Sequence, residues 1–253
     1  MIAYHGKQTV KDDLIAQLIA HEEADEITQG TGWENGKGCA VGCTLHAYDH
    51  RQGPEKLGWP EWLLHLEDNL FEAMTTADAM GFPRRVAEAI PVGADLKPVR
   101  RRFLHWLLTD FLGREWPADV NAVLDDMSTL FARAIAGDEP TAAQWAKAAE
   151  AAGAARAAGA ARAAGAAWAA GAAWAARDAE AARAARDAGD AGAARDAWDA
   201  GDAGAARDAW AARDAEAAGA ARAARAAWAA RAAWAAKQQA DKLVSLLSEA
   251  VIP

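Results

Sequence analysis

The sequence of 253 residues contains little cysteine and no long apolar run. Its two cysteines, Cys39 and Cys43, are too few for a disulfide scaffold. No stretch of about eighteen apolar residues is free of charge, and residues 1–10 lack both a basic start and an apolar run. These absences exclude a membrane span and a signal peptide, so we expect a cytoplasmic protein that has no membrane partner.

A net basic surface is also missing. The formal charge is −9, and most of it lies in residues 1–145, which hold 13 Lys and Arg against 23 Asp and Glu. Acidic surfaces disfavour nonspecific binding to DNA, RNA or anionic lipid. We therefore expect a protein partner rather than nucleic acid. Arg100, Arg101 and Arg102 form the local exception, and we interpret them as a solvated helix face.

Residues 1–140 predict an acidic, all-α domain that folds as a helical bundle. Apolar residues recur at helical spacing between proline and glycine signals, and no alternating pattern typical of hairpins appears. The expected helices begin near Thr9, at Cys39, after Pro60, at Pro83, at Leu96 and at Ala118. The last two helices are expected to end at Leu112 and Ile135.

Cysteine and histidine are the candidate chemical groups of this domain. Cys39 follows a glycine-rich turn at a predicted helix start, where free backbone amides and the helix dipole favour a thiolate. Cys39 is therefore a candidate catalytic nucleophile, with His46 as its base. The alternative is that the small residues around Cys39 allow close helix packing. No phosphate-binding glycine loop, serine elbow or dinucleotide fingerprint occurs.

A metal site is a second hypothesis for the same segment. Cys39, Cys43, His46 and His50 follow one another at spacings of four, three and four residues, which places them on one face of a single helix. At about 1.5 Å per residue the first and last lie roughly 16 Å apart, so one zinc ion takes only a neighbouring pair from that helix. The remaining ligands would come from elsewhere. The available imidazoles are His21, His65 and His105.

A repeat of three residues occupies positions 146–237. Ala146 and every third residue up to Ala236 are alanine, 31 in succession. A second class of positions holds every Arg, Trp, Gly, Glu and Lys, and the third is alanine or aspartate. We expect three parts of the chain: the helical domain 1–140, a triplet-repeat domain 141–237, and a C-terminal capping helix 238–253 that closes the far end of the repeat.

The strict period favours packed 3₁₀-helices in the repeat, with long α-helices as the alternative. Residues three apart align in a 3₁₀-helix, whereas an α-helix would rotate each class by about 60° per triplet. The rarity of long 3₁₀ runs and the α-propensity of alanine argue for the alternative.

The variable class forms a stripe of aromatic and basic side chains. Such a stripe resembles a stacking platform for single-stranded nucleic acid, but most of the aspartates directly follow an arginine and offer it an internal partner. We therefore interpret the stripe as packing. Its marker residues are Trp168, Trp174, Arg177, Trp198, Trp210, Arg213, Trp228 and Trp234.

Three segments together resemble a family of uncharacterised bacterial and phage proteins. The segments are the run from Gly38 to His46 (GCAVGCTLH), Leu66 to Asp68, and Glu88 to Asp95. Members of that family join such an N-terminal helical domain to an alanine-rich repeat tail. The resemblance covers nearly the whole chain, and it implies an architecture without an activity.

The leading hypothesis from the sequence is a noncatalytic structural or protein-interaction module without a cofactor. The alternative is a cysteine-dependent or zinc-dependent enzyme centred on Cys39, Cys43, His46 and His50. Binding of single-stranded nucleic acid through the repeat is the weaker third hypothesis.

Overall fold

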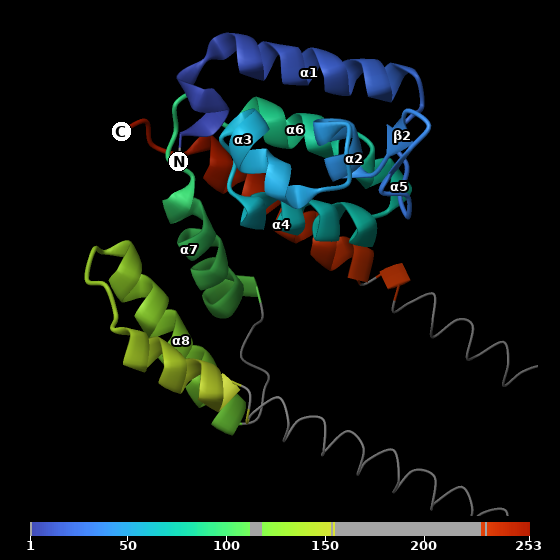
Figure 1. Ribbon diagram of the computed structural model, residues 1–253. Helices are drawn as coiled ribbons and strands as arrows, with labels where there is room; N and C mark the ends of the chain where they lie inside the picture. Colours follow the sequence, from blue (N-terminus) through green and yellow to red (C-terminus); the bar gives the residue numbers. More distant parts are fainter. Residues whose placement is uncertain (1, 112–117, 153, 155–228, 231) are drawn as a thin grey trace, which may run out of the picture. The chain divides into compact units, whose positions relative to one another are not determined.

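The computed structural model describes residues 2–111, 118–152, 154, 229–230 and 232–253 (Figure 1). Contacts divide the chain into two units. The first, called the base here, consists of Met1–Trp145 together with Trp228–Pro253, and the second, called the insert, is Ala146–Ala227. The base is therefore built from both sides of the insert.

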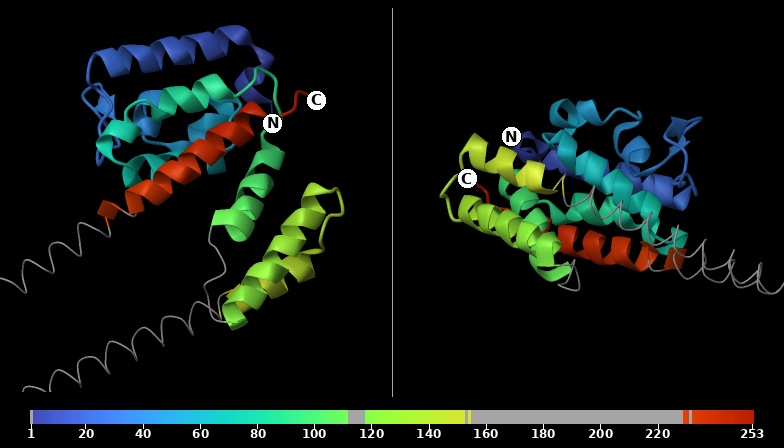
Figure 2. Two further views of the ribbon diagram at one scale, coloured as in Figure 1. Left: turned by 180° about the vertical axis from the view of Figure 1, so that it is seen from behind. Right: turned by 90° about the horizontal axis from the view of Figure 1, so that it is seen from below.

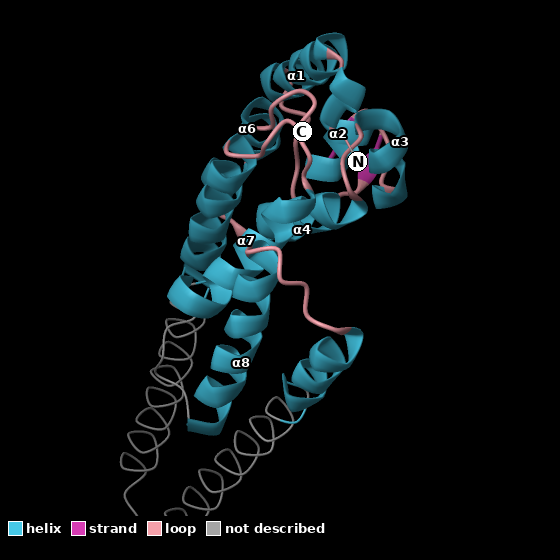
Figure 3. Ribbon diagram, turned by 90° about the vertical axis from the view of Figure 1, so that its left-hand side faces the viewer, coloured by secondary structure: helices cyan, strands magenta, loops and turns pink. Residues whose placement is uncertain are grey.

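The described part of the chain is mostly α-helical, in agreement with the all-α fold that the sequence predicts (Figure 3). Helical turns η1 (Ala3–Gly6), η2 (His50–Gln52) and η3 (Leu107–Phe111) accompany the α-helices. The α-helices are α1 (Gln8–Glu23), α2 (Ala40–Leu45), α3 (Gly53–Leu57), α4 (Glu61–Ala73), α5 (Thr76–Ala79), α6 (Phe82–Ala89), α7 (Lys97–Trp106) and α8 (Ala118–Ile135). Residues 142–152 and 232–248 are also α-helical. No helix in these described ranges is both long and apolar enough to cross a bilayer.

The predicted and observed helix bounds agree best where a proline or a clear apolar periodicity marks the helix. Helix α4 begins directly after Pro60, and Leu63, Leu64, Leu70 and Phe71 face the core at helical spacing. Helix α8 has the predicted bounds. These confirmed elements depend on local signals alone.

The helix expected to run from Cys39 to Gly53 is much shorter in the structure. Helix α2 ends at Leu45, and His46 adopts a left-handed backbone conformation with φ 51°. Side chains bind the carbonyls that this ending exposes: the Gln17 amide donates to the Cys43 and Thr44 carbonyls, and Lys56 Nζ lies 2.6 Å from the Leu45 oxygen. The prediction that the four Cys and His residues share one helix face was therefore wrong.

A small antiparallel hairpin, β1 (Trp33–Glu34) and β2 (Lys37–Gly38), precedes α2. Its turn is Asn35-Gly36, and both residues have positive φ. An Asn-Gly pair is the typical two-residue hairpin turn, so the sequence did carry a signal for this element. The hairpin places Gly38 so close to the Gly32 carbonyl that any β-carbon there would overlap it.

The C-terminal helix, residues 232–248, belongs to the core of the base, which is not the expected role at the far end of the repeat. Leu243 and Leu247 are fully buried with residues from α1, α4 and α6. Viewed from behind, this helix crosses the base beside α6 (Figure 2). Arg85 of α6 forms an ion pair with Asp241 at 2.6 Å, and the Asp95 amide donates to the Val251 carbonyl.

Most of the triplet repeat lies outside the described residues. The stripe residues from Trp168 to Trp228 and the predicted 3₁₀ packing belong to that part. At the described ends of the repeat, residues 146–152 and 232–237 are α-helical. Trp234 is the one stripe residue described, and its side chain is exposed.

Candidate functional site

The four Cys and His candidates divide between two clusters on opposite ends of α2. Cys39 and His50 lie with Asp68 and Glu72 of α4. Cys43 and His46 instead lie near Glu26, and His46 bonds to His21. The left-handed backbone at His46 redirects the chain after α2, so His50 does not continue the helix that carries Cys43.

The Cys39 cluster consists of the Cys39 thiol and the Asp68 and Glu72 carboxylates, and the His50 imidazole lies beside it against Asp68. The Cys39 sulfur and one carboxylate oxygen each of Asp68 and Glu72 lie within 4.8 Å of one another. His50 Nε2 is 3.3 Å from Asp68 Oδ2, and Tyr48 donates its hydroxyl to the same oxygen at 3.0 Å. Within the described ranges, this is the one group of three metal-ligating residues with converging donor atoms.

Burial and charge work against ionisation of the Cys39 thiol. Burial is the largest cause, and together with the neighbouring Asp68 carboxylate it raises the pKa of Cys39 to about 12. The backbone amides of Gly42 and Val41 act in the opposite direction. His46, the base expected for a nucleophile at Cys39, lies in the other cluster. The geometry thus places carboxylates beside the thiol, and the nearby His50 imidazole lies against Asp68 rather than against the thiol.

The His46 cluster is a chain of hydrogen bonds from a carboxylate to the surface. Glu26 Oε2 lies 2.7 Å from His21 Nδ1, and His21 Nε2 lies 2.8 Å from His46 Nε2. Trp33 stacks on the His46 ring with 4.9 Å between ring centroids. Burial, followed by His21 and Lys56, lowers the pKa of His46. The two imidazoles and the carboxylate therefore satisfy one another.

Cys43 has structural partners. Its thiol donates to the Gly38 carbonyl at 3.4 Å, and burial raises its pKa to about 11. Cys39, which directly precedes α2, and Cys43 inside α2 thus have different surroundings, although both are buried.

Sequence reasoning missed Tyr48, Asp68 and Glu72. Asp68 and Glu72 are four residues apart on α4, which places both carboxylates on one face of that helix. That spacing was readable in the sequence. Nothing in the sequence indicates that this face of α4 meets the start of α2, because such a contact depends on tertiary packing. His65 stacks on His50, whereas His105 belongs to neither cluster.

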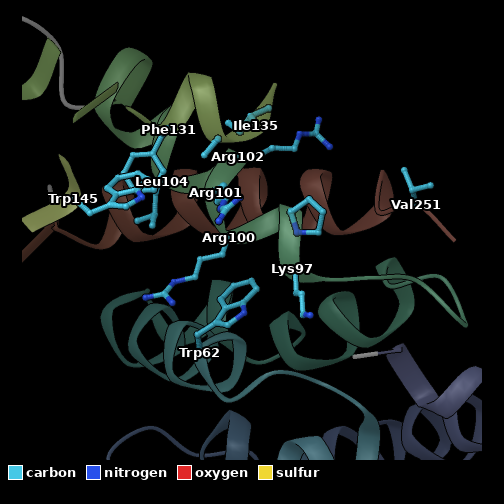
Figure 4. Close-up of a pocket in the computed structure, with 12 residues that line it drawn as sticks. Trp62, Lys97, Arg100, Arg101, Arg102, Leu104, Phe131, Ile135, Trp145 and Val251 are labelled. Atoms are coloured by element: carbon cyan, nitrogen blue, oxygen red, sulfur yellow. The ribbon is translucent and has the colours of Figure 1, made fainter. Parts of the chain in front are cut away.

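A pocket of about 770 Å³ lies between α4, α7, α8 and residues near Trp145 (Figure 4). Lys97 and Arg100 lie on either side of the Trp62 ring, and neither forms an ion pair in the described part of the chain. The other two arginines of the run are neutralised by carboxylates: Arg101 pairs with Glu139 at 2.7 Å, and Arg102 pairs with Glu249. The remaining wall is apolar and contains Leu104, Phe131, Ile135 and Trp145.

Comparisons with protein-family models, curated proteins and solved structures find no match to this chain. We therefore infer the function from the geometry of the base.

Proposed function

We propose that the protein is a noncatalytic structural or protein-interaction module in which the base holds both ends of the alanine-rich insert. The observation that carries this proposal is the buried position of Leu243 and Leu247, which follow the insert but pack in the same core as Leu18 and Phe71. The chain leaves the base after Trp145 and rejoins it at Trp228.

The composition of the two units supports a division of roles. The base supplies the large buried side chains, among them Trp59, Phe71, Phe82 and Phe103. The insert consists mainly of alanine, which buries little apolar area per residue. Anchoring both ends lowers the conformational entropy that the insert must lose to adopt an ordered arrangement.

Two further features support an interaction role over catalysis. The thiols of Cys39 and Cys43 both have a raised pKa, so thiolate is scarce at neutral pH. The base is acidic, which favours a protein partner over nucleic acid.

Cutting the insert tests the proposal. A protease recognition site inserted within residues 155–227 is cleaved under native conditions, and the products are separated by size-exclusion chromatography. We expect the two fragments to elute together, because the C-terminal helix stays in the core of the base. In about 6 M urea the same fragments should separate. Release of the C-terminal fragment without denaturant, or a thiol that reacts rapidly at neutral pH, would contradict the proposal.

Binding of a small organic anion is a second candidate function, and the pocket beside Trp62 favours it. Its volume of about 770 Å³ falls in the range of small-molecule sites. Lys97 and Arg100 offer two cations without an ion-pair partner among the described residues, and the aromatic wall offers contact for a planar group. The fitting ligand class is therefore an aromatic acid, sulfonate or phosphate.

An aryl sulfonate dye tests the pocket, with 8-anilinonaphthalene-1-sulfonate as the probe and fluorescence as the readout. Arg100→Gln is expected to weaken binding about tenfold, because it removes an exposed cation at the pocket. Arg51→Gln is the matched control, since Arg51 is exposed and pairs with Asp49 elsewhere on the base. Equal loss in both variants, or equal binding of a neutral arylamine, would show nonspecific binding and overturn this candidate.

A further inference from the structure

The Cys39 cluster contains a buried carboxylate that the surrounding protein leaves partly uncompensated. Asp68 is 8% exposed, and its Oδ1 atom has no hydrogen-bond partner in the described part of the chain. No lysine or arginine of that part forms an ion pair with Asp68 or Glu72, and His50 is the one group there that can offer positive charge to Asp68. A buried carboxylate in this position is costly unless a cation or further donors compensate it.

We propose that Cys39, His50, Asp68 and Glu72 bind a divalent transition-metal ion of the zinc class. The donors are one sulfur, one imidazole nitrogen and two carboxylate oxygens, a set that suits zinc and contains too few oxygens for calcium or magnesium. The ion would join the start of α2 to the middle of α4. This inference does not depend on the proposed module function, and its failure would leave that proposal untouched.

The distances are compatible with a tetrahedral site after small side-chain movements. Zinc bonds of about 2.0–2.3 Å place neighbouring donor atoms roughly 3.3–3.8 Å apart. His50 Nε2 lies 3.3 Å from Asp68 Oδ2 but stands outside the converging group of Cys39, Asp68 and Glu72, so its imidazole has to shift toward the other donors. The sulfur and the carboxylate oxygens lie within 4.8 Å, so a contraction of about 1 Å brings them to bonding distance. Glu72 is exposed, so its side chain can supply part of that movement.

Neighbouring groups hold the donor side chains by hydrogen bonds, as is usual around protein metal sites. Tyr48 donates to Asp68 Oδ2, and the Gly30 amide donates to Glu72 Oε2 at 2.8 Å. Because Cys39 precedes the first turn of α2, the amides of Val41 and Gly42 lie against its sulfur and favour a thiolate ligand. The His50 ring stacks on His65, with 4.0 Å between ring centroids.

The His46 cluster lacks this capacity because its donor atoms are already occupied. His21 uses both ring nitrogens, one toward Glu26 and one toward His46. The Cys43 thiol donates to backbone carbonyls. Of the four metal ligands considered from the sequence, the proposed site keeps Cys39 and His50. The two carboxylates of α4, Asp68 and Glu72, complete it.

Titration of metal-free protein with Co²⁺, followed by competition with Zn²⁺, tests the site. We expect one equivalent of cobalt to bind with a thiolate-to-cobalt charge-transfer band in the near ultraviolet and to be displaced by one equivalent of zinc. The band requires a sulfur ligand, so it separates this site from adventitious binding to surface carboxylates. Circular dichroism of each variant verifies its fold before titration.

The two cysteines provide a matched pair of variants. Cys39→Ala should abolish the band and weaken zinc binding at least 100-fold, whereas Cys43→Ala, an equally buried thiol on the same helix, should leave both unchanged. Glu72→Gln should weaken zinc binding at least tenfold, with the exposed Glu61→Gln on the same helix as its control. Absence of the band in the wild-type protein, or its loss in Cys43→Ala as well, would overturn the proposal.

Discussion

Replacing Glu67 with methionine is expected to raise the free energy of unfolding by about 1–3 kcal/mol, measured by urea denaturation at neutral pH. Glu67 is 0% exposed, and neither carboxylate oxygen has a hydrogen-bond partner within the described residues. On α4 it shares a face with Leu63 and Phe71, so a methionine of similar size fits an apolar position. The gain comes from removing an unsatisfied buried carboxyl group.

The pH dependence of the Glu67→Met effect follows from the sign of the pKa shift. Burial, followed by repulsion from Asp68, raises the pKa of Glu67 well above its usual value of 4.5. Between pH 4.5 and the raised pKa, the folded protein keeps a proton on Glu67 that the unfolded chain has released. The free energy of unfolding therefore falls as the pH rises through this range. The advantage of the methionine variant should accordingly grow with pH over that range.

Glu61→Met is the control for the Glu67 prediction. Glu61 begins α4 with an exposed side chain, and its replacement should change stability by no more than about 0.5 kcal/mol. A loss of stability in Glu67→Met, or a gain that does not depend on pH, would show that the Glu67 carboxyl is favourably compensated.

Leu247→Ala is expected to destabilise the whole base by about 2–5 kcal/mol. The Leu247 side chain is 0% exposed and belongs to the core formed with α1, α4 and α6, so its truncation leaves a cavity there. Trp234→Ala provides the control in the same helix, because Trp234 is 62% exposed and its loss should have little effect. If the two variants lose similar stability, Leu247 has no special role in the core.

Local signals in the sequence were enough for the helical class and for several helix bounds. Proline before α4 and the apolar periodicity of α8 fix those helices whatever the surroundings are. The hairpin was missed although Asn35-Gly36 signals its turn. The early end of α2 was not readable, because Gln17 and Lys56 satisfy its carbonyls from other parts of the chain.

The candidate site was predicted in part for the same reason. Cys39 and His50 lie within twelve residues of each other, so the sequence singled out the segment that contributes two of the four candidate ligands. Their partners, Asp68 and Glu72, depend on the packing of α4 against the start of α2, which no local pattern encodes. Residues 238–253 were expected to cap the far end of the repeat, whereas the C-terminal helix packs in the core of the base. The amphipathic pattern of a helix shows that one face is buried, but it does not indicate which core that face joins.

Native-state hydrogen exchange of the wild-type protein and the Leu247→Ala variant tests most directly whether the C-terminal helix is part of the base. The account predicts that amides of residues 240–247 and of α4 exchange with the same free energy of opening, and that the variant lowers both by the same amount. Rapid exchange in residues 240–247 with unchanged protection in α4 would contradict it, since the C-terminal helix would then open independently of the base.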